Sequence, residues 1–212
     1  MASNLAVCRK CRQAGEKLFL KGTKCRTGKC AMEKTPSTPG QHGRKSGMKK
    51  VSEYGKQLKE KQKVKMMYGV LEKQFKRFFK NASNLKGSTG ESLISLLECR
   101  LDNVLFRLKM AFSRDQARQL VVHGHVNVNG KKVKSPSFVV KEGDIITLSE
   151  RSLNKKTLME TIVDKRMNIG VKVPEWLELD KQDRKGVILR LPIRSDVTIP
   201  IEEHLIVELY SK

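Results

Sequence analysis

Positive charge is concentrated at one end of this chain of 212 residues. Lysine and arginine number 44 against 22 aspartates and glutamates, a formal net charge of +22 at pH 7. Residues 1–90 hold 23 basic and 5 acidic side chains and therefore carry +18 of that excess. Repulsion on this scale opposes a compact fold unless a polyanion relieves it. We therefore expect this part to bind nucleic acid. An anionic membrane surface is the weaker alternative, because residues 41–50 have no apolar stripe.

The apolar content limits what the chain can bury by itself. Hydrophobic residues make up 38% and aromatic residues 5% of the sequence, so we expect a modest core in one large or two small domains. No apolar run approaches the roughly 20 residues of a membrane-spanning helix. The first residues lack the apolar stretch of a secretory signal. These features predict a cytoplasmic protein with no membrane partner.

Four of the five cysteines lie within the first thirty residues, at Cys8, Cys11, Cys25 and Cys30. Their C-x2-C-x13-C-x4-C spacing is typical of a tetrahedral site of four thiolates. The surrounding lysines and arginines are expected to lower the pKa of these thiols. One zinc ion is the expected occupant, with a four-iron four-sulfur cluster or two disulfides as alternatives. Four protein sulfurs leave no open position for catalysis, and Cys99 is expected to be a small buried residue.

Apolar periodicity predicts a helical middle part. It indicates helices over residues 52–69 and 71–82, then one long helix from about residue 89 to Leu108. An aromatic stripe on the second helix is expected to lie in the core. Proline and glycine between residues 36 and 47 instead predict an extended basic linker over residues 32–50, ordered by its partner.

Residues 113–148 predict a short helix followed by a small antiparallel sheet. Ser113 and Gln116 have the capping-box pattern, and Asn129-Gly130 is a strong hairpin signal. Residues 187–191 and 205–210 alternate and predict further strands, whose neighbours the sequence does not reveal. The expected fold class is α+β, with a metal-stapled N-terminal arm, a helical domain and a helix–hairpin module.

Polar residues gather on the short helix and hairpin, away from the apolar positions, where a helix N-terminus beside arginine suits phosphate. The candidate RNA-binding residues of this block are Ser113, Arg114, Gln116, Arg118, Gln119, His123, Gly124, His125, Asn127, Asn129 and Lys131. Those nearer the N-terminus are Arg9, Arg12, Gln41, His42, Arg44, Lys45, Lys49, Lys50 and Tyr54. Alanine at Arg114 or Arg118 is expected to weaken RNA binding and to leave the fold intact.

Several stretches resemble a known family. RLDNV at 100–104, SRDQARQLV at 113–121 and HGHVNVNG at 123–130 are similar to the S-four-type RNA-binding module. PGQHG at 39–43, EKQK at 60–63 and the ending EHLIVELYSK are similar to the bacterial small-subunit ribosomal protein S-four family. The four cysteines resemble its metal-binding subtype. The resemblance extends from Cys8 to Lys212.

The resemblance implies a primary binder of small-subunit rRNA that nucleates assembly of the 5′ domain. It also implies contacts with ribosomal proteins S-five and S-three, a place for the basic linker at the mRNA entrance, and an influence on decoding accuracy. The linker is expected to track mRNA, with anchorage of rRNA as the alternative. The expected segments are a metal-binding arm and linker (1–45), a helical domain (46–91), the RNA-binding module (92–170) and a C-terminal return segment (171–212).

Two other functions use the same module. An RNA-modifying or tRNA-charging enzyme would need a catalytic domain, and too few residues follow the predicted sheet to form one. The tripeptide Arg100-Leu101-Asp102 resembles that of pseudouridine synthases, but Leu101 is predicted to be buried. A factor for stalled large subunits would be shorter and would lack the cysteine-rich arm. We expect a binding protein with no small-molecule substrate rather than an enzyme.

Overall fold

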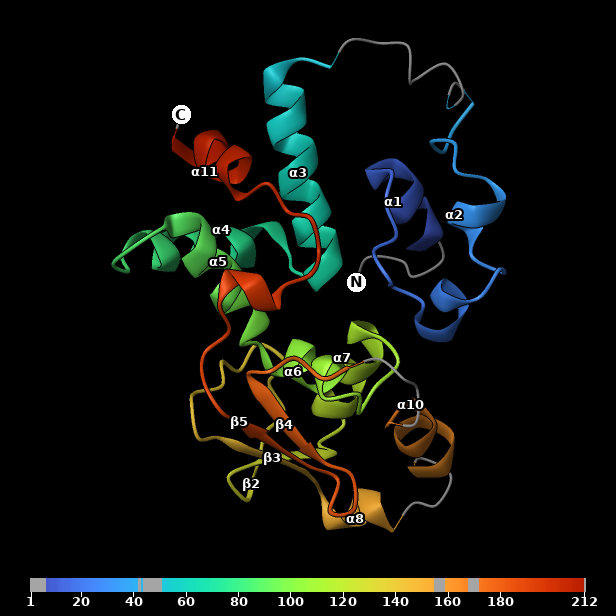
Figure 1. Ribbon diagram of the computed structural model, residues 1–212, viewed down its shortest axis with the longest axis vertical. Coiled ribbons are helices and arrows are strands. Elements are labelled where there is room, and N and C mark those ends of the chain that lie inside the picture. Colours follow the sequence, from blue (N-terminus) through green and yellow to red (C-terminus); the bar gives the residue numbers. More distant parts are fainter. Residues whose placement is uncertain (1–6, 42, 44–50, 155–158, 168–171, 212) are drawn as a thin grey trace. The chain divides into compact units, whose positions relative to one another are not determined.

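The computed structural model describes residues 7–41, 43, 51–154, 159–167 and 172–211. The chain forms two compact units (Figure 1). The first comprises Met1–Arg77 with Pro200–Lys212, and the second Phe78–Ile199. The C-terminal residues contribute to both units, up to Ile199 in the second and from Pro200 in the first.

The first unit is helical. It contains α1 (Val7–Ala14), the 3-10 helix η2 (Gly22–Arg26), α2 (Ala31–Lys34), α3 (Glu53–Tyr68), the start of α4 (Glu72–Ser83) and α11 (Glu203–Ser211). The Ser52 hydroxyl caps α3 by accepting the Gly55 N–H, and Gly69 ends the helix in the left-handed conformation. Helices α3 and α4 confirm the two helices that periodicity predicts.

Helix α11 packs beside α3 (Figure 1). Gln57 Nε2 donates to Glu208 Oε2 over 2.8 Å, and the Phe75 and Tyr210 rings stack with centroids 6.2 Å apart. The prediction of a strand over residues 205–210 is therefore wrong. Leu205 and Ile206 are buried neighbours, which a helix face accommodates and a half-buried strand does not.

In the second unit, the end of α4 is followed by three helices, with a break between the first two. Helices α5 (Thr89–Glu98), α6 (Leu101–Arg107) and α7 (Arg114–Val122) follow one another. The long helix predicted from residue 89 to Leu108 is wrong, because Arg100 is extended and forms a β-bridge with Val139. Leucine periodicity continues across the break, so the sequence pattern conceals it.

A five-stranded antiparallel sheet completes this unit, in the order β2-β1-β3-β5-β4. The strands are β1 (Val126–Val128), β2 (Lys131–Lys132), β3 (Ile145–Leu148), β4 (Leu177–Asp180) and β5 (Lys185–Ile188). Asn129 and Gly130 both have positive φ, which confirms the predicted hairpin between β1 and β2. The strand predicted over residues 187–191 begins and ends earlier, as β5, and pairs with β3 of the module.

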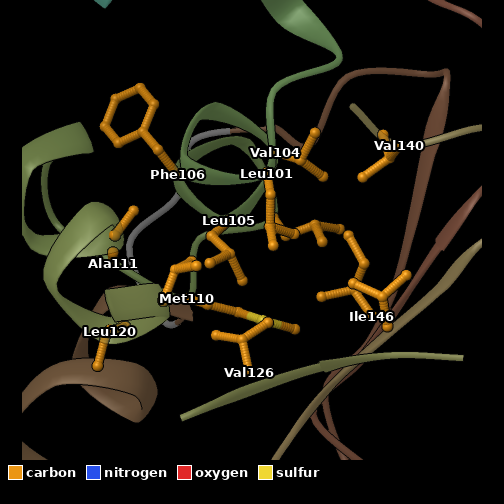
Figure 2. Close-up of a cluster of buried hydrophobic side chains, with 14 of the residues drawn as sticks. Leu101, Val104, Leu105, Phe106, Met110, Ala111, Leu120, Val126, Val140 and Ile146 are labelled. Atoms are coloured by element: carbon orange, nitrogen blue, oxygen red, sulfur yellow. The ribbon is translucent and has the colours of Figure 1, made fainter. Parts of the chain in front are cut away.

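Helices α6 and α7 pack against the sheet around one hydrophobic core (Figure 2). Leu101 and Leu105 of α6 lie beside Val126 of β1 and Ile146 of β3, and Trp176 is also buried in this cluster. Short helices follow β3, namely α8 (Glu150–Leu153), the π-helix η4 (Met159–Asp164) and α10 (Lys165–Met167), and the 3-10 helix η5 (Arg194–Asp196) follows β5. The architecture is thus α+β, as expected.

Candidate nucleic-acid interface

The N-terminus of α7 is built by its own side chains. The Gln116 N–H donates to Ser113 Oγ over 3.2 Å, and Gln116 Oε1 accepts the Phe112 N–H over 2.8 Å. These bonds satisfy amides that a helix start leaves without partners. The predicted cap is confirmed, and it engages Ser113 Oγ and Gln116 Oε1, which belong to two candidate RNA ligands.

Arg114 lies inside the unit. Its side chain is 7% exposed, its Nε donates to Asn103 Oδ1 over 2.7 Å, and its guanidinium lies over the Phe106 ring at 4.6 Å. The prediction that Arg114 belongs to an exposed polar face is therefore wrong. The reason is that α7 packs on α6, which presents Asn103 and Phe106 to the first turn of α7.

A buried polar network extends from this contact to α5. Asn103 Nδ2 donates to Glu98 Oε2 over 2.7 Å, and Arg107 forms two bonds to the same carboxylate, of 2.9 and 2.6 Å. Each charged group has a charged or polar partner, as burial requires. The network ties α5, α6 and α7 together, and sequence analysis missed it, although Asn103 and Arg107 have the i, i+4 spacing of one helix face.

The tripeptide Arg100-Leu101-Asp102 has a structural role. Asp102 is 3% exposed and forms two bonds to Arg100, of 3.1 and 2.7 Å. Arg100 is also fully buried and lies over the Phe78 ring. An aspartate held in this way is not available to a substrate.

The exposed candidates gather at the end of α7 and on the hairpin. Arg118, Gln119 and His123 are exposed on α7 and its C-cap, and Asn129 and Lys131 are exposed on the hairpin. The exposed basic, amide and imidazole side chains of α7, its C-cap and strand β2 are called the module face below, namely Arg118, Gln119, His123, Lys131 and Lys132. Helix α7 also exposes Asp115 and Val122. This face combines cations with amide and imidazole donors, the groups that contact phosphate and sugar in RNA complexes.

Lys132 is a member of this face that sequence analysis did not select. A Cβ on Gly124 would lie 2.3 Å from Lys132 Cε, so the lysine stem lies directly over Gly124 at the end of α7. Gly124 is buried with φ +72°, a conformation that favours glycine. The predicted role of Gly124 at the end of the helix agrees with this geometry. Lys132 could have been selected because the hairpin pairs it with Asn127, which is itself a candidate.

Two further candidates are engaged within the unit. His125 is half-buried and its Nδ1 lies 2.7 Å from Ser152 Oγ, which in turn lies 2.6 Å from Ser149 Oγ. The Asn129 amide donates to Asp144 Oδ1 and accepts the Ile145 N–H, both over 2.8 Å. Asn127, between them, is half-buried on β1. His125 and Asn129 thus fix the hairpin as well as bordering the module face.

The N-terminal candidates belong to the first unit. Arg9, Gln41 and Tyr54 are exposed and Arg12 is half-buried. His42, Arg44, Lys45, Lys49 and Lys50 lie outside the described residues, and with them most of the basic part of the linker predicted over residues 32–50. The start of that linker is not extended, because residues 32–34 belong to helix α2.

The four N-terminal cysteines are free thiols that influence one another electrostatically. Burial is the main cause that raises the pKa of Cys11 and of Cys25, and the neighbouring cysteine thiols raise both further. Lys17 lowers the pKa of Cys25, as expected of a nearby cation, but burial outweighs it and the net direction is upward for both thiols. Among the described residues, no group of three or more histidine, cysteine or acidic side chains is arranged to hold a metal ion. Cys99, as expected, is buried, which raises its pKa to about 12.

Comparison with known proteins identifies the class to which this fold and face belong. Residues 4–98 match the family model of the ribosomal protein S4/S9 N-terminal domain, and residues 99–146 match that of the S4 domain. The second match covers α6, α7 and the hairpin, and therefore all the residues of the module face.

Relatives of similar length show the protein family to which the chain belongs. A protein from Ruminiclostridium cellulolyticum is 51% identical over 207 residues, which is 98% of this chain and 97% of the relative. A protein from Caldicellulosiruptor bescii is 54% identical over 205 residues, 97% and 96% of the two chains. Both are named small ribosomal subunit protein uS4. The chain belongs to the ribosomal protein S4 family, and it is not an enzyme. No helix in the described ranges is long and apolar enough to cross a membrane.

Proposed function

We propose that the chain is a structural constituent of the small ribosomal subunit and binds its rRNA, in the cytoplasm, through the module face. The observation that carries this proposal is the similarity over nearly the full length to proteins named for that subunit. The module face supports it locally, because it presents exposed cations and amides on rigid secondary structure and no cluster of catalytic groups.

The buried network fixes the position of α7 and therefore of the side chains that α7 contributes to the module face. Ser113, Arg114 and Gln116 hold the first turn of α7, while Arg118, Gln119 and His123 project from its exposed side. Contacts to phosphate from such side chains fix position and orientation on RNA, and carry little sequence information by themselves. Recognition of this kind depends on the shape of the RNA.

The resemblance to the ribosomal S4 family supports a more specific role within the small subunit. We propose that the chain acts as a primary binder of the 5′ domain and nucleates its assembly. We further propose contacts with ribosomal proteins S-five and S-three, a position at the mRNA entrance and an influence on decoding accuracy. The basic residues of the linker, Arg44, Lys45, Lys49 and Lys50, would track mRNA there.

A metal site in the N-terminal arm is a separate proposal. Cys8, Cys11, Cys25 and Cys30 would hold one zinc ion, with a four-iron four-sulfur cluster as the alternative. Four thiols without disulfide bonds, three of them buried, lie within electrostatic range of one another, and this donor set suits either group. The group would supply folding free energy rather than reactivity, on the order of 10–16 kcal/mol for structural zinc.

Elemental analysis tests the metal site. Protein purified without oxidation should contain one zinc ion, or four iron atoms, per chain. Cys11→Ser should lose the metal and expose the arm to proteases, whereas Cys99→Ser should keep both the metal and the protection. Protein with neither metal in stoichiometric amount would disprove the site.

Filter binding to an rRNA 5′-domain fragment tests the module face. Arg118→Ala should weaken binding by about 1–2 kcal/mol, the scale of a charge-assisted hydrogen bond. Arg151 is also exposed but lies on α8, outside the face, and Arg151→Ala serves as the matched control. Equal affinities for the two variants and the wild type, with normal melting, would show that the face has been assigned wrongly.

A further inference from the structure

A buried lysine joins several segments of the first unit. The Lys63 side chain on α3 is 7% exposed, and its ammonium group lies within hydrogen-bond distance of three oxygen acceptors. These are Glu60 Oε1 at 2.8 Å, the Pro200 carbonyl oxygen at 2.9 Å and Glu16 Oε1 at 3.4 Å. An ammonium group has three protons to donate, so these acceptors use its full capacity. A lysine buried to this extent requires such partners.

The three acceptors belong to parts of the chain that are far apart in sequence. Glu60 lies one turn before Lys63 on α3. Glu16 comes directly after Gly15, which follows the last residue of α1 and has a φ of +82°. Pro200 is the first residue of the C-terminal part of this unit. Lys63 therefore connects the end of the helix that carries two of the N-terminal cysteines with the segment that leads into α11.

Residues 200–211, called the C-terminal strap below, pack on α3 through polar and apolar contacts. The Glu202 N–H donates to Glu60 Oε1 over 3.0 Å, and the same oxygen binds Lys63. Farther along the strap, Glu208 accepts from Gln57. The buried apolar side chains of the strap are Ile201, Leu205 and Ile206. A segment this short, at the end of a chain, can separate from its neighbours without unfolding of the whole unit.

The contact of Lys63 with Glu16 depends on its surroundings. The Glu16 side chain is 42% exposed, whereas that of Glu60 is 11% exposed. An ion pair in water contributes little, and it becomes stronger where neighbouring groups exclude water. The strap places Pro200 against the Lys63 ammonium group and so helps to exclude water from it. Docking of the strap should therefore strengthen the pair of Lys63 with Glu16, and an ordered Glu16 should hold Lys63 in place for the strap.

We propose that Lys63 couples the end of α1 to the C-terminal strap, so that release of either segment loosens the other. The coupling has two states, one with the strap docked over Lys63 and one with the strap released and Lys63 in water. Because coupling free energies are reciprocal, a change at α1 alters the strap and a change at the strap alters α1. All the residues involved lie outside the module face, so the inference does not depend on the RNA proposed to bind there.

Hydrogen exchange of the full-length protein, measured by mass spectrometry of its peptides, tests the coupling from both ends. Glu16→Ala removes the acceptor that follows α1, and Gln13→Ala, at an exposed position on α1, is its control. Ile206→Ala loosens the strap away from Lys63, and His204→Ala, at an exposed position on α11, is its control.

A third pair of variants addresses the lysine itself. Lys63→Met should speed exchange in both segments, whereas Lys59→Met, at an exposed position on the same helix, should speed it in neither. Should Lys63→Met fail to fold, the variants at Glu16 and Ile206 decide the question, because neither removes a buried charge.

Each substitution should act on the segment that it does not touch. Glu16→Ala should speed amide exchange in residues 201–211 by about fivefold or more, the lower end of typical couplings between sites. Ile206→Ala should do the same in residues 7–16, and the controls should change either segment by less than about twofold. Amides in the middle of α3 and in α5–α7 should keep their wild-type protection.

Two results would overturn the inference. Faster exchange confined to the substituted segment, in both Glu16→Ala and Ile206→Ala, would show that the two segments are independent. Faster exchange to the same extent throughout the first unit, the middle of α3 included, would indicate general destabilisation rather than coupling through Lys63.

Discussion

The sequence pattern around Arg114 predicts the wrong environment for its side chain. It follows an N-cap and lies four residues before Arg118, so the two arginines are expected on one side of a short helix. In the structure Arg118 is exposed, whereas Arg114 turns toward Asn103 and Phe106 of α6. The sequence predicts where a residue lies along α7. It does not predict that α6 covers the first turn of α7, because that contact arises from tertiary packing.

Arg114 and Arg118 should therefore respond differently to substitution. Arg114→Met takes the Nε donor away from Asn103 Oδ1 and removes the nearer of the two guanidinium groups over the Phe106 ring, so the free energy of unfolding should fall by about 2–3 kcal/mol. Arg118→Met should leave it unchanged within about 0.5 kcal/mol. Urea unfolding of both variants measures this, and equal stabilities would contradict the burial of Arg114.

Gly124 offers a second comparison at this scale. Gly124 and Gly143 both have positive φ, but a Cβ would meet Lys132 only at Gly124 and open space at Gly143. Alanine at either site should cost about 1 kcal/mol or more in backbone strain. Only Gly124→Ala should also displace Lys132 and weaken binding to the rRNA fragment. If both variants bind RNA like the wild type, Lys132 has no role in the module face.

Helix starts and hairpin turns are predicted correctly where the residues that determine them lie within a few positions of each other. Ser52, Ser113 and Asn129-Gly130 all act within a few residues, and the helix starts and the hairpin that they predict are present. The break at Arg100 and the helix α11 could not be predicted, because they depend on distant partners. Arg100 pairs with Val139, and α11 is fixed by its contacts with α3.

The contact of α3 with α4 predicts a specific dependence on pH. Hydrogen bonds from Lys61 and then Lys65 lower the pKa of Glu72 to about 2, from an ordinary value of 4.5. A lowered folded-state pKa stabilises the fold above the unfolded value, and that contribution is lost as pH falls through the folded value. Since Glu72 is half-exposed, solvent screens the effect and the total is modest.

Unfolding measured between pH 6 and pH 2 checks this contribution. The stability advantage of the wild type over Glu72→Gln should be constant above about pH 5, shrink below about 4.5 and vanish near 2. Glu178→Gln is the control, because Glu178 is exposed on β4, away from the α3 lysines. An advantage of Glu72 that persists unchanged at pH 2 would contradict the ion pairs.

The net charge of the whole molecule and its family membership both indicate RNA as the partner. The first 90 residues carry most of the net charge of +22. The two family models match residues 4–146, and the relatives cover almost the whole chain. The sequence motifs could identify the family because they are contiguous. They could not show which polar side chains build the scaffold and which remain exposed, since Arg114 and Arg118 are the same residue type on one helix and differ only in their surroundings.

The central claim is that this chain recognises small-subunit rRNA through a pre-formed module face. Its most direct test is the affinity of the full-length protein for the 5′-domain rRNA fragment and for an equally long fragment of another rRNA domain, at the same salt concentration. We expect binding to the first fragment to be at least 100-fold tighter. The triple substitution Arg118→Ala, Lys131→Ala and Lys132→Ala should remove most of that preference without lowering the melting temperature. Equal affinity for the two fragments, or a preference that survives the triple substitution, would contradict it.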